Sequence, residues 1–534
     1  MGKWRDAFAL SASQVSEAEP PGTAKILAQR PRDELSGDAL VVNHDGEIIK
    51  FPAPSADPRD PLNFPQWHKM AALFVVSVYA FVGNFTSSVI APGFQIWNFT
   101  FPHDPRSVSQ LTYLSAVHVL FLGAGNIWWV PLSNWLGRRP VLIVATLIMT
   151  LCSVWCALSP NYDSLLAARI FQGIGGAASD TVAPALVGDL FFIHQRGKAM
   201  ALYTILLCVG PLVGGIAGGY IAFRHGWAYL FWVSTALSAF CFVGALVFVP
   251  ETLFVRYTVP ESSSRISSTA KGAEETQMEQ QPSAMTYKPY SFAATLGFGK
   301  THGRLLQHVM KPWRTLALPG TWVVMLHYAG LVGGIVTITT VGPQILAMPP
   351  YLWKENVGLI NLGGIIGAAL GYAYTFVLSD WLLKRRAKSA RNGMAEAEDR
   401  LPSLFFPLGV ATSGLLVFGF CAQYPGPDRW VGLGAAFAMV AFGLMQIPSV
   451  GFNYLIDSYG ALAADAFTMV TILRAIISFA WTFFAVEWVQ SRGAAEPFGI
   501  FGMLMGLFSL TTVPLWVYGK RMRIATASKV ERWN

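Results

Sequence analysis

The fold of this chain is decided by one segment, Leu165–Gly219, which begins LLAARIFQGIGGAASD (165–180) and ends ALYTILLCVGPLVGGIAGG (201–219). Arg169 and Asp180 interrupt a run of small and apolar residues that is long enough to cross a bilayer. On a helix these two residues, eleven positions apart, are separated by about 16 Å and share nearly the same face. A charge at membrane depth costs at least ~2.5 kcal/mol, so it usually faces a cavity or a partner. The segment therefore indicates a transport pathway, or a tie between helices in the case of Arg169.

The composition is that of a multi-span membrane protein. Hydrophobic residues make up 53% of the 534 and charged residues only 13%, whereas a soluble domain carries about 25% charged residues. Apolar runs of about 20 residues recur along the chain. The net charge of +8 comes from short loops beside these runs, so we expect no nucleic-acid partner. The five cysteines have no metal-ligand spacing, and we expect no metal, no cofactor and no enzyme activity.

The apolar runs predict an all-α polytopic protein with twelve transmembrane helices in two six-helix halves. The expected domains are a disordered N-terminal segment (1–66), a first half (67–249), a polar linker (250–315), a second half (316–518) and a tail (519–534). The segment Leu305–Trp313, just before the seventh run, is expected to lie on the membrane surface as an amphipathic helix.

The loops predict the orientation of the chain. With the N-terminus inside, the inner loops and tail hold fifteen Lys and Arg residues and the outer loops five. This excess places both termini in the cytoplasm. We expect the protein to be located in the plasma membrane. Asn98, in the sequence Asn98-Phe99-Thr100 of the first outer loop, is a candidate glycosylation site.

The two halves share a short repeat. LSNWLGRR (132–139) follows the second run and LSDWLLKR (378–385) follows the eighth, with five of eight positions identical. Two halves repeated in the same orientation are typical of transporters that rock around a site between the halves.

At these positions the chain resembles the major facilitator superfamily. The segment Leu132–Leu142 is similar to motif A of that family, with Gly137, Arg138 and Arg139 in place. The resemblance implies that these residues form a conformational switch. Asn134 stands where the family usually has Asp and carries no fixed charge, while Asp380 supplies a carboxylate at the equivalent place in the second half.

Two further motifs extend the resemblance. Leu165–Ala177 is similar to motif B, in which Arg169 is the residue associated with proton coupling. A guanidinium does not release its own proton, so Arg169 would act by biasing a nearby carboxylate or amide. The segment that contains Gly210, Pro211, Gly214 and Gly215 resembles motif C, which is associated with antiporters. Plain tight packing of small residues is the alternative.

Four segments make the chain similar to the fungal twelve-span drug:proton antiporters. They are Pro61–Lys69, Asp189–Arg196, Pro250–Phe254 and Asn453–Tyr459. Members of that branch export drugs, polyamines or secondary metabolites, and some relatives import.

Asp180 is the first candidate for a group that takes up a proton, because a buried carboxyl group can exchange protons near neutrality. The alternative is a permanently paired structural acid. His118 and His327 have suitable intrinsic pKa values, although a lone His on a helix is more often a satisfied core residue. Glu487 is a weaker candidate that can reach water.

His118 and His327 are also candidates for a substrate cavity, together with three more residues. Arg474 is a second intramembrane cation, which would pair with Asp465 or Asp457 or face an anionic ligand. Tyr328 and Tyr454 suit planar or amphipathic substrates, or else anchor the helices at the membrane interface.

The sequence therefore predicts a monomeric secondary transporter, whose partners are the lipid bilayer, protons and a small-molecule substrate. We expect export of an amphipathic organic compound driven by inward proton flow. In this mechanism the protonation of an acid near Arg169 shifts the balance between inward-open and outward-open states. The alternatives are a proton symporter or facilitator that imports a small solute, and a nutrient sensor that transports nothing.

Overall fold

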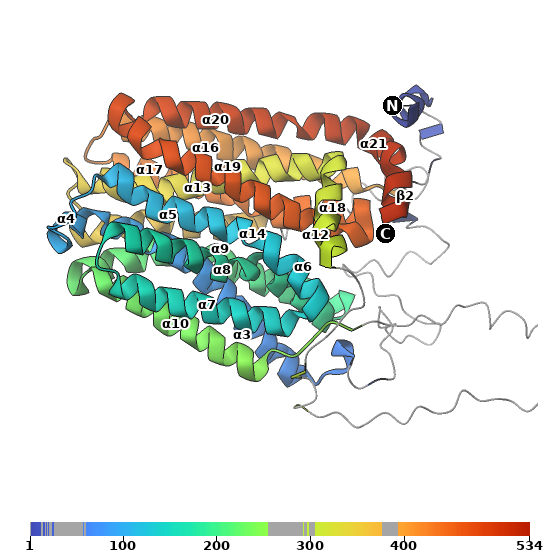
Figure 1. Ribbon diagram of the computed structural model, residues 1–534. Helices are drawn as coiled ribbons and strands as arrows, with labels where there is room; N and C mark the ends of the chain where they lie inside the picture. The colour runs from blue at the N-terminus through green and yellow to red at the C-terminus, as the bar shows by residue number, and fades with distance from the viewer. Residues whose placement is uncertain are drawn as a thin grey trace, which may run out of the picture.

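The computed structural model describes residues 2–11, 60–254, 305–375 and 394–533, together with a few isolated positions. These residues are almost entirely helical, and the long helices run side by side in one bundle (Figure 1). The first half contains α3 (Gln66–Ser88), α5 (Val108–Ala124), α6 (Asn126–Leu136), α7 (Arg138–Leu158), α8 (Tyr162–Leu190), α9 (Ile193–His225) and α10 (Trp227–Phe248). The second half contains α13 (Pro319–Ala347), η5 (Lys354–Ile360), α14 (Asn361–Tyr374), η7 (Ala397–Leu404), α16 (Phe405–Gln423), α17 (Arg429–Leu444), α18 (Phe452–Tyr459), α19 (Ala463–Arg492), α20 (Ala495–Leu510) and α21 (Thr512–Trp533).

Twelve segments of this bundle correspond to the twelve predicted spans. In the described part of the chain, 11 helical segments are long and apolar enough to cross a membrane, five from the first half and six from the second. The segment outside that set is α8, whose 29 residues include Arg169, Asp180 and several small polar side chains. It packs against α5 and α7 and completes the first half.

The small residues of the motif-C segment allow α9 to contact two partners. A Cβ atom added at Gly210, Gly214 or Gly218 would collide with the backbone carbonyl of Phe81 or Phe85 on α3, or of Val89 directly after it. Glycines therefore let the two helix backbones touch. The other glycines of this segment, Gly215 and Gly219, face Asn361 and Glu355 of the second half. The small residues of this motif thus allow α9 to pack closely against α3 of its own half and against the second half.

The termini lie together at one end of the bundle, which we call the terminal end (Figure 1). Residues Gly2–Ala9 form helix α1, which differs from the disorder that we expected for 1–66. The reason is packing against α21: Ala7 is buried, the rings of Phe8 and Tyr518 lie 5.9 Å apart, and Arg521 donates a 2.7 Å hydrogen bond to the carbonyl of Phe8. Most of the expected tail (519–534) is likewise the end of α21.

The linker contributes one described helix, α12 (Leu305–Arg314), at the terminal end. It packs against α6 of the first half and α19 of the second, so it crosses the seam between them. Leu306, Met310 and Trp313 remain exposed on its outer side. The amphipathic helix expected here is therefore present, and its position on the membrane surface stays a prediction.

A buried ionic cluster joins η7 to α21 at the terminal end. Lys520 and Arg523 each donate a 2.7 Å hydrogen bond to Glu396, and Arg523 also pairs with Glu398 at 2.5 Å. Burial alone would raise the pKa of Glu396, but the hydrogen bonds from Lys520 and Arg523 outweigh it and lower this pKa.

We expect the substitution Glu396→Gln to lower the free energy of unfolding by about 1–2 kcal/mol at pH 7, because charge-assisted hydrogen bonds are lost. A lowered carboxyl pKa gives stability that is present above the unfolded-state value of 4.5 and is lost as the pH falls through the folded-state value. The difference between the two proteins should therefore shrink below about pH 4.5. Unfolding in detergent micelles at pH 7 and pH 4 measures this difference. An equal difference at both pH values would contradict the role of the carboxylate.

Candidate functional site

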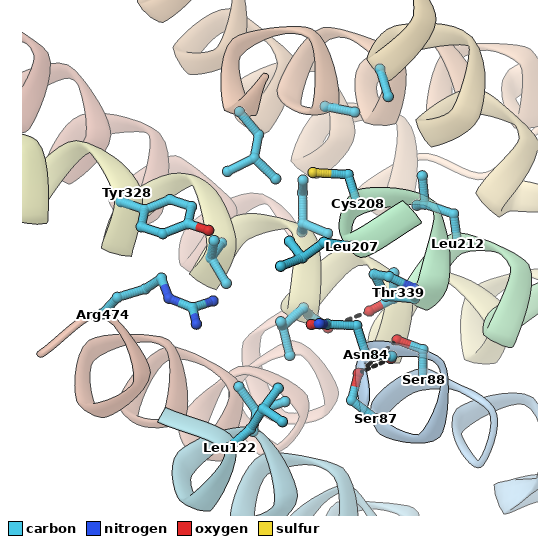
Figure 2. A pocket seen from close by; sticks show the side chains of 18 of the residues that line it. Asn84, Ser87, Ser88, Leu122, Leu207, Cys208, Leu212, Tyr328, Thr339 and Arg474 are labelled. Carbon is cyan, nitrogen blue, oxygen red and sulfur yellow. Dashed lines mark hydrogen bonds between the residues drawn. The ribbon is translucent and has the colours of Figure 1, made fainter. Parts of the chain in front are cut away.

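A cavity lies between the two halves near the middle of the bundle. The space between its wall atoms is about 720 Å³, which includes open solvent at its mouth. The apolar wall includes Leu122, Leu207, Leu212, Val332 and Ile335. The polar groups of the wall are Asn84, Ser87 and Ser88 from α3, Cys208 from α9, Tyr328 and Thr339 from α13, and Arg474 from α19 (Figure 2).

A buried ion pair joins the halves beside this cavity. Arg474 Nη2 of α19 donates to Asp180 Oδ2 of α8 at 2.7 Å, and the two side chains are only 7% and 6% exposed. The other carboxylate oxygen of Asp180 lies 3.3 Å from Ser179 Oγ and 3.5 Å from Asn84 Nδ2. Because one partner belongs to each half, separating the halves at this level must break the pair.

Arg474 has capacity for one more partner. Its guanidinium lies 4.8 Å from the centre of the Tyr328 ring, and in Figure 2 both side chains reach into the cavity. Its Nε atom is buried and makes no hydrogen bond to any residue that the structure describes. The sequence suggested Asp457 or Asp465 as its partner. Instead, Arg474 pairs with Asp180, and Asp457 pairs with Arg400 at 2.9 Å.

Arg169 lies apart from the cavity wall, inside the first half. It is fully buried and donates to the carbonyls of Leu114 and Thr86 at 3.1 and 2.8 Å and to Gln172 Oε1 at 2.7 Å. Within the described residues these partners tie α8 to α5 and α3, and none of them is an acid. The acid that we expected beside Arg169 is therefore not found there, since Asp180 has a different environment on the same helix.

Three of the residues proposed for the cavity are placed elsewhere. His118 is buried in the first half with Nε2 3.3 Å from Thr86 Oγ1. His327 lies 2.9 Å from the carbonyl of Phe508 and 3.2 Å from Thr512 Oγ1, inside the second half. Tyr454 is buried on α18 against Gly320. Only Tyr328 and Arg474 of the proposed set line the cavity.

The motif-A residues form an ionic cluster at the terminal end of the first half. The carboxylate of Glu251 accepts hydrogen bonds from the backbone N–H groups of Arg138 and Arg139 at 3.0 and 3.3 Å, which caps the start of α7. Arg138 pairs with Asp189 at 2.9 Å. Gly137 has φ +106°, a conformation that favours glycine, and a side chain there would also displace the Glu251 carboxylate.

The other two residues expected in the conformational switch, Asn134 and Asp380, contribute no ion pair or hydrogen bond to this cluster within the described part of the chain. The side chain of Asn134 makes no hydrogen bond within the described part of the chain, and the carboxylates of this cluster come from Glu251 and Asp189. Asp380 lies outside the described residues.

The halves are closed against each other at the end of the bundle opposite the termini. Arg224 pairs with Glu355 at 2.9 Å, Tyr220 donates to Asn356 at 2.9 Å, and Gln95 donates to the carbonyl of Pro343 at 3.2 Å. Asn98 is exposed at this same end, on the short helix α4 (Trp97–Thr100), and accepts a hydrogen bond from the backbone of Arg106. Its glycosylation stays a prediction.

Sequence reasoning missed the polar patch of α3. Asn84, Ser87 and Ser88 are spaced i, i+3 and i+4 near the end of α3, so they share one face. This spacing of polar residues in a membrane span indicates a helix face that lines a cavity.

The sequence model of the Major Facilitator Superfamily matches residues 70–482, more than half of the chain. The chain belongs to this family. It is therefore a membrane transporter rather than an enzyme.

Curated relatives of this family member are fungal transporters. The MFS-type transporter tndD of Aspergillus flavipes is 27% identical, over 97% of this chain and 94% of its own length. The efflux pump radE of Floropilus chiversii is 25% identical, over 96% and 90%. The citrinin biosynthesis cluster MFS transporter mrr1 of Monascus ruber is 26% identical, over 93% and 95%.

Solved structures confirm the major facilitator fold of this chain. A crystal structure of a D-xylose-proton symporter matches with a TM-score of 0.58 at 16% identity, covering 83% of this chain and 97% of the symporter. The crystal structure of the human organic anion transporter MFSD10 matches with a TM-score of 0.51 at 16% identity, covering 84% and 100%.

Proposed function

We propose that this chain is a proton-coupled exporter of an amphipathic organic compound. The observation that carries the proposal is the Asp180–Arg474 pair, which joins the two halves beside a mostly apolar cavity. The names of two relatives support export, because radE is called an efflux pump and mrr1 a citrinin biosynthesis cluster transporter. We place the protein in the plasma membrane with both termini in the cytoplasm.

The proposed coupling acts through Asp180. Protonation of Asp180 removes its negative charge and therefore its attraction for Arg474. The states in which the pair is made lose stability relative to those in which the halves have separated at this level. A cargo that favours the paired states thus competes with the proton, and this competition couples the two flows. Arg169 supports the mechanism as a positioning residue, since it fixes α8, which carries Asp180, against α3 and α5.

The test is transport by the full chain in sealed proteoliposomes with an imposed pH gradient. Three fluorescent probes cover the charge classes: Nile red is neutral, rhodamine 6G is a cation and fluorescein is an anion. We expect the movement of at least one probe to accelerate when protons flow in the opposite direction, and a protonophore to remove the acceleration.

The matched variant for this test is Asp180→Asn, which keeps the size of the side chain and removes the titratable group. We expect the gradient-driven component of transport to fall by at least about 10-fold, since the proton-responsive charge is gone. Acceleration by protons that flow in the same direction as the probe would instead show symport. An unchanged gradient response in Asp180→Asn would remove this acid from the mechanism.

A further inference from the structure

Arg474 and Tyr328 contribute two hydrogen-bond donors to one side of the cavity, which we call the subsite. Arg474 Nε has no partner within the described residues. The same holds for the hydroxyl of Tyr328, which points into the cavity beside it (Figure 2). On the opposite wall, the hydroxyls of Ser87 and Thr339 already donate to backbone carbonyls of their own helices, at 2.6 and 2.9 Å.

The net charge at this subsite is zero while the ion pair is made. Arg474 is the only charged residue that the structure describes in the cavity wall. Its charge is neutralised by Asp180, which does not belong to the lining residues. An ionised cargo would leave water for an apolar space without a counter-charge, at a large cost. A cation would in addition meet the guanidinium. An anion would share this guanidinium with the Asp180 carboxylate and be repelled by it.

From these observations we propose that the cavity binds neutral amphipathic compounds through a carbonyl-type oxygen, which accepts hydrogen bonds from Arg474 Nε and the Tyr328 hydroxyl. The apolar remainder of the compound lies against the Leu, Val and Ile side chains of the wall. This inference rests on the proposed function and narrows its cargo to one chemical class.

The subsite also explains how a neutral cargo competes with a proton. Asp180 binds Nη2 of Arg474 and thereby fixes the guanidinium beside the cavity, with its buried Nε atom left without a partner in the described residues. When Asp180 is protonated, this hold is lost and the donor is no longer fixed in place. A neutral oxygen therefore binds best to the ionised pair, whereas an anion would bind best after protonation, which would couple it to the proton in the opposite sense.

The experiment measures binding to the full chain in lipid nanodiscs, without a pH gradient and relative to empty nanodiscs. Four probes share one ring system: fluorenone carries a carbonyl, fluorene carries no oxygen, 9-fluorenecarboxylate is an anion and 9-(aminomethyl)fluorene is a cation. We expect fluorenone to bind at least about 10-fold more tightly than each of the other three, as the hydrogen bond to a charged donor predicts.

Two variants locate the binding. Arg474→Lys keeps a cation for Asp180 but has no Nε donor, and Tyr328→Phe keeps the ring but not the hydroxyl. Each should weaken fluorenone binding, by about 10-fold and a few-fold respectively, and leave fluorene binding unchanged. Arg492→Lys is the matched control on the same helix, because Arg492 is exposed and far from the cavity wall.

The proposal is overturned if fluorenone binds no better than fluorene, if the carboxylate or the amine binds as tightly as the ketone, or if neither variant changes ketone binding. This binding experiment uses no pH gradient. Such a result would therefore not contradict proton-driven transport, which the proteoliposome experiment tests separately.

Discussion

The substitution Arg474→Met is expected to lower the free energy of unfolding by about 3–5 kcal/mol, because it leaves a buried carboxylate without its cation. The pair is almost fully removed from solvent, with side-chain exposures of 7% and 6%. The remaining neighbours of Asp180, Ser179 and Asn84, lie at 3.3 and 3.5 Å and offer only neutral hydrogen bonds. They cannot replace a guanidinium.

The double variant Asp180→Asn with Arg474→Met separates the cost of a lone charge from the net contribution of the pair. Replacing both members of a buried pair is often close to neutral, so we expect most of the lost stability to return. Unfolding of the single and double variants in detergent micelles gives the coupling free energy. Arg492→Met, at an exposed position of the same helix, controls for the loss of an arginine. A loss below about 1 kcal/mol in Arg474→Met would mean that water reaches the pair and screens it.

The second large effect is expected at the contact between α9 and α3. In Gly214→Ala the new methyl group meets the backbone carbonyl of Phe85, at a distance that requires the helices to separate. Overpacking of this kind costs about 1–3 kcal/mol, and we expect the upper end of that range because a backbone atom cannot turn aside as a side chain can.

A matched control for this variant is Gly499→Ala on α20, where an added Cβ meets nothing within 4 Å. It should be neutral or stabilise the helix by up to about 1 kcal/mol, because alanine has the higher helix propensity. Thermal unfolding of the two variants in the same detergent makes the comparison. Equal behaviour of the two would show that α9 and α3 do not pack through their backbones.

Much of the fold could be predicted because membrane spans leave a local signal. Apolar runs of bilayer length fix the number of helices, and glycines such as Gly137 mark where one span turns into the next. The role of Gly210, Gly214 and Gly218 could also be predicted from their spacing. Four residues make about one helical turn, so the three glycines share one helix face that can contact another helix. The charges of α8 were informative as well, because they indicated that this span faces a cavity or a partner helix.

The partner of Arg474 could not be predicted from the sequence. Asp180 lies 294 residues away in the other half, and no periodicity relates the rotation of one helix to that of another. Asp457 and Asp465 were closer in sequence and therefore more obvious choices, but helix α19 turns Arg474 toward the first half. The same limit explains α1: its eight residues contain no strong signal, and the surface of α21 that they contact is more than 500 positions away.

The contact between α1 and α21 has a practical consequence for anyone who labels this transporter. The amino terminus is seated on the last helix of the second half, although the chain enters the first half only at about residue 60. A fluorophore attached at the start of the chain will therefore follow the carboxy-terminal bundle while this contact lasts. A donor and acceptor placed at the two chain ends would report almost no change during a transport cycle, and a useful pair needs one label on a loop of the first half.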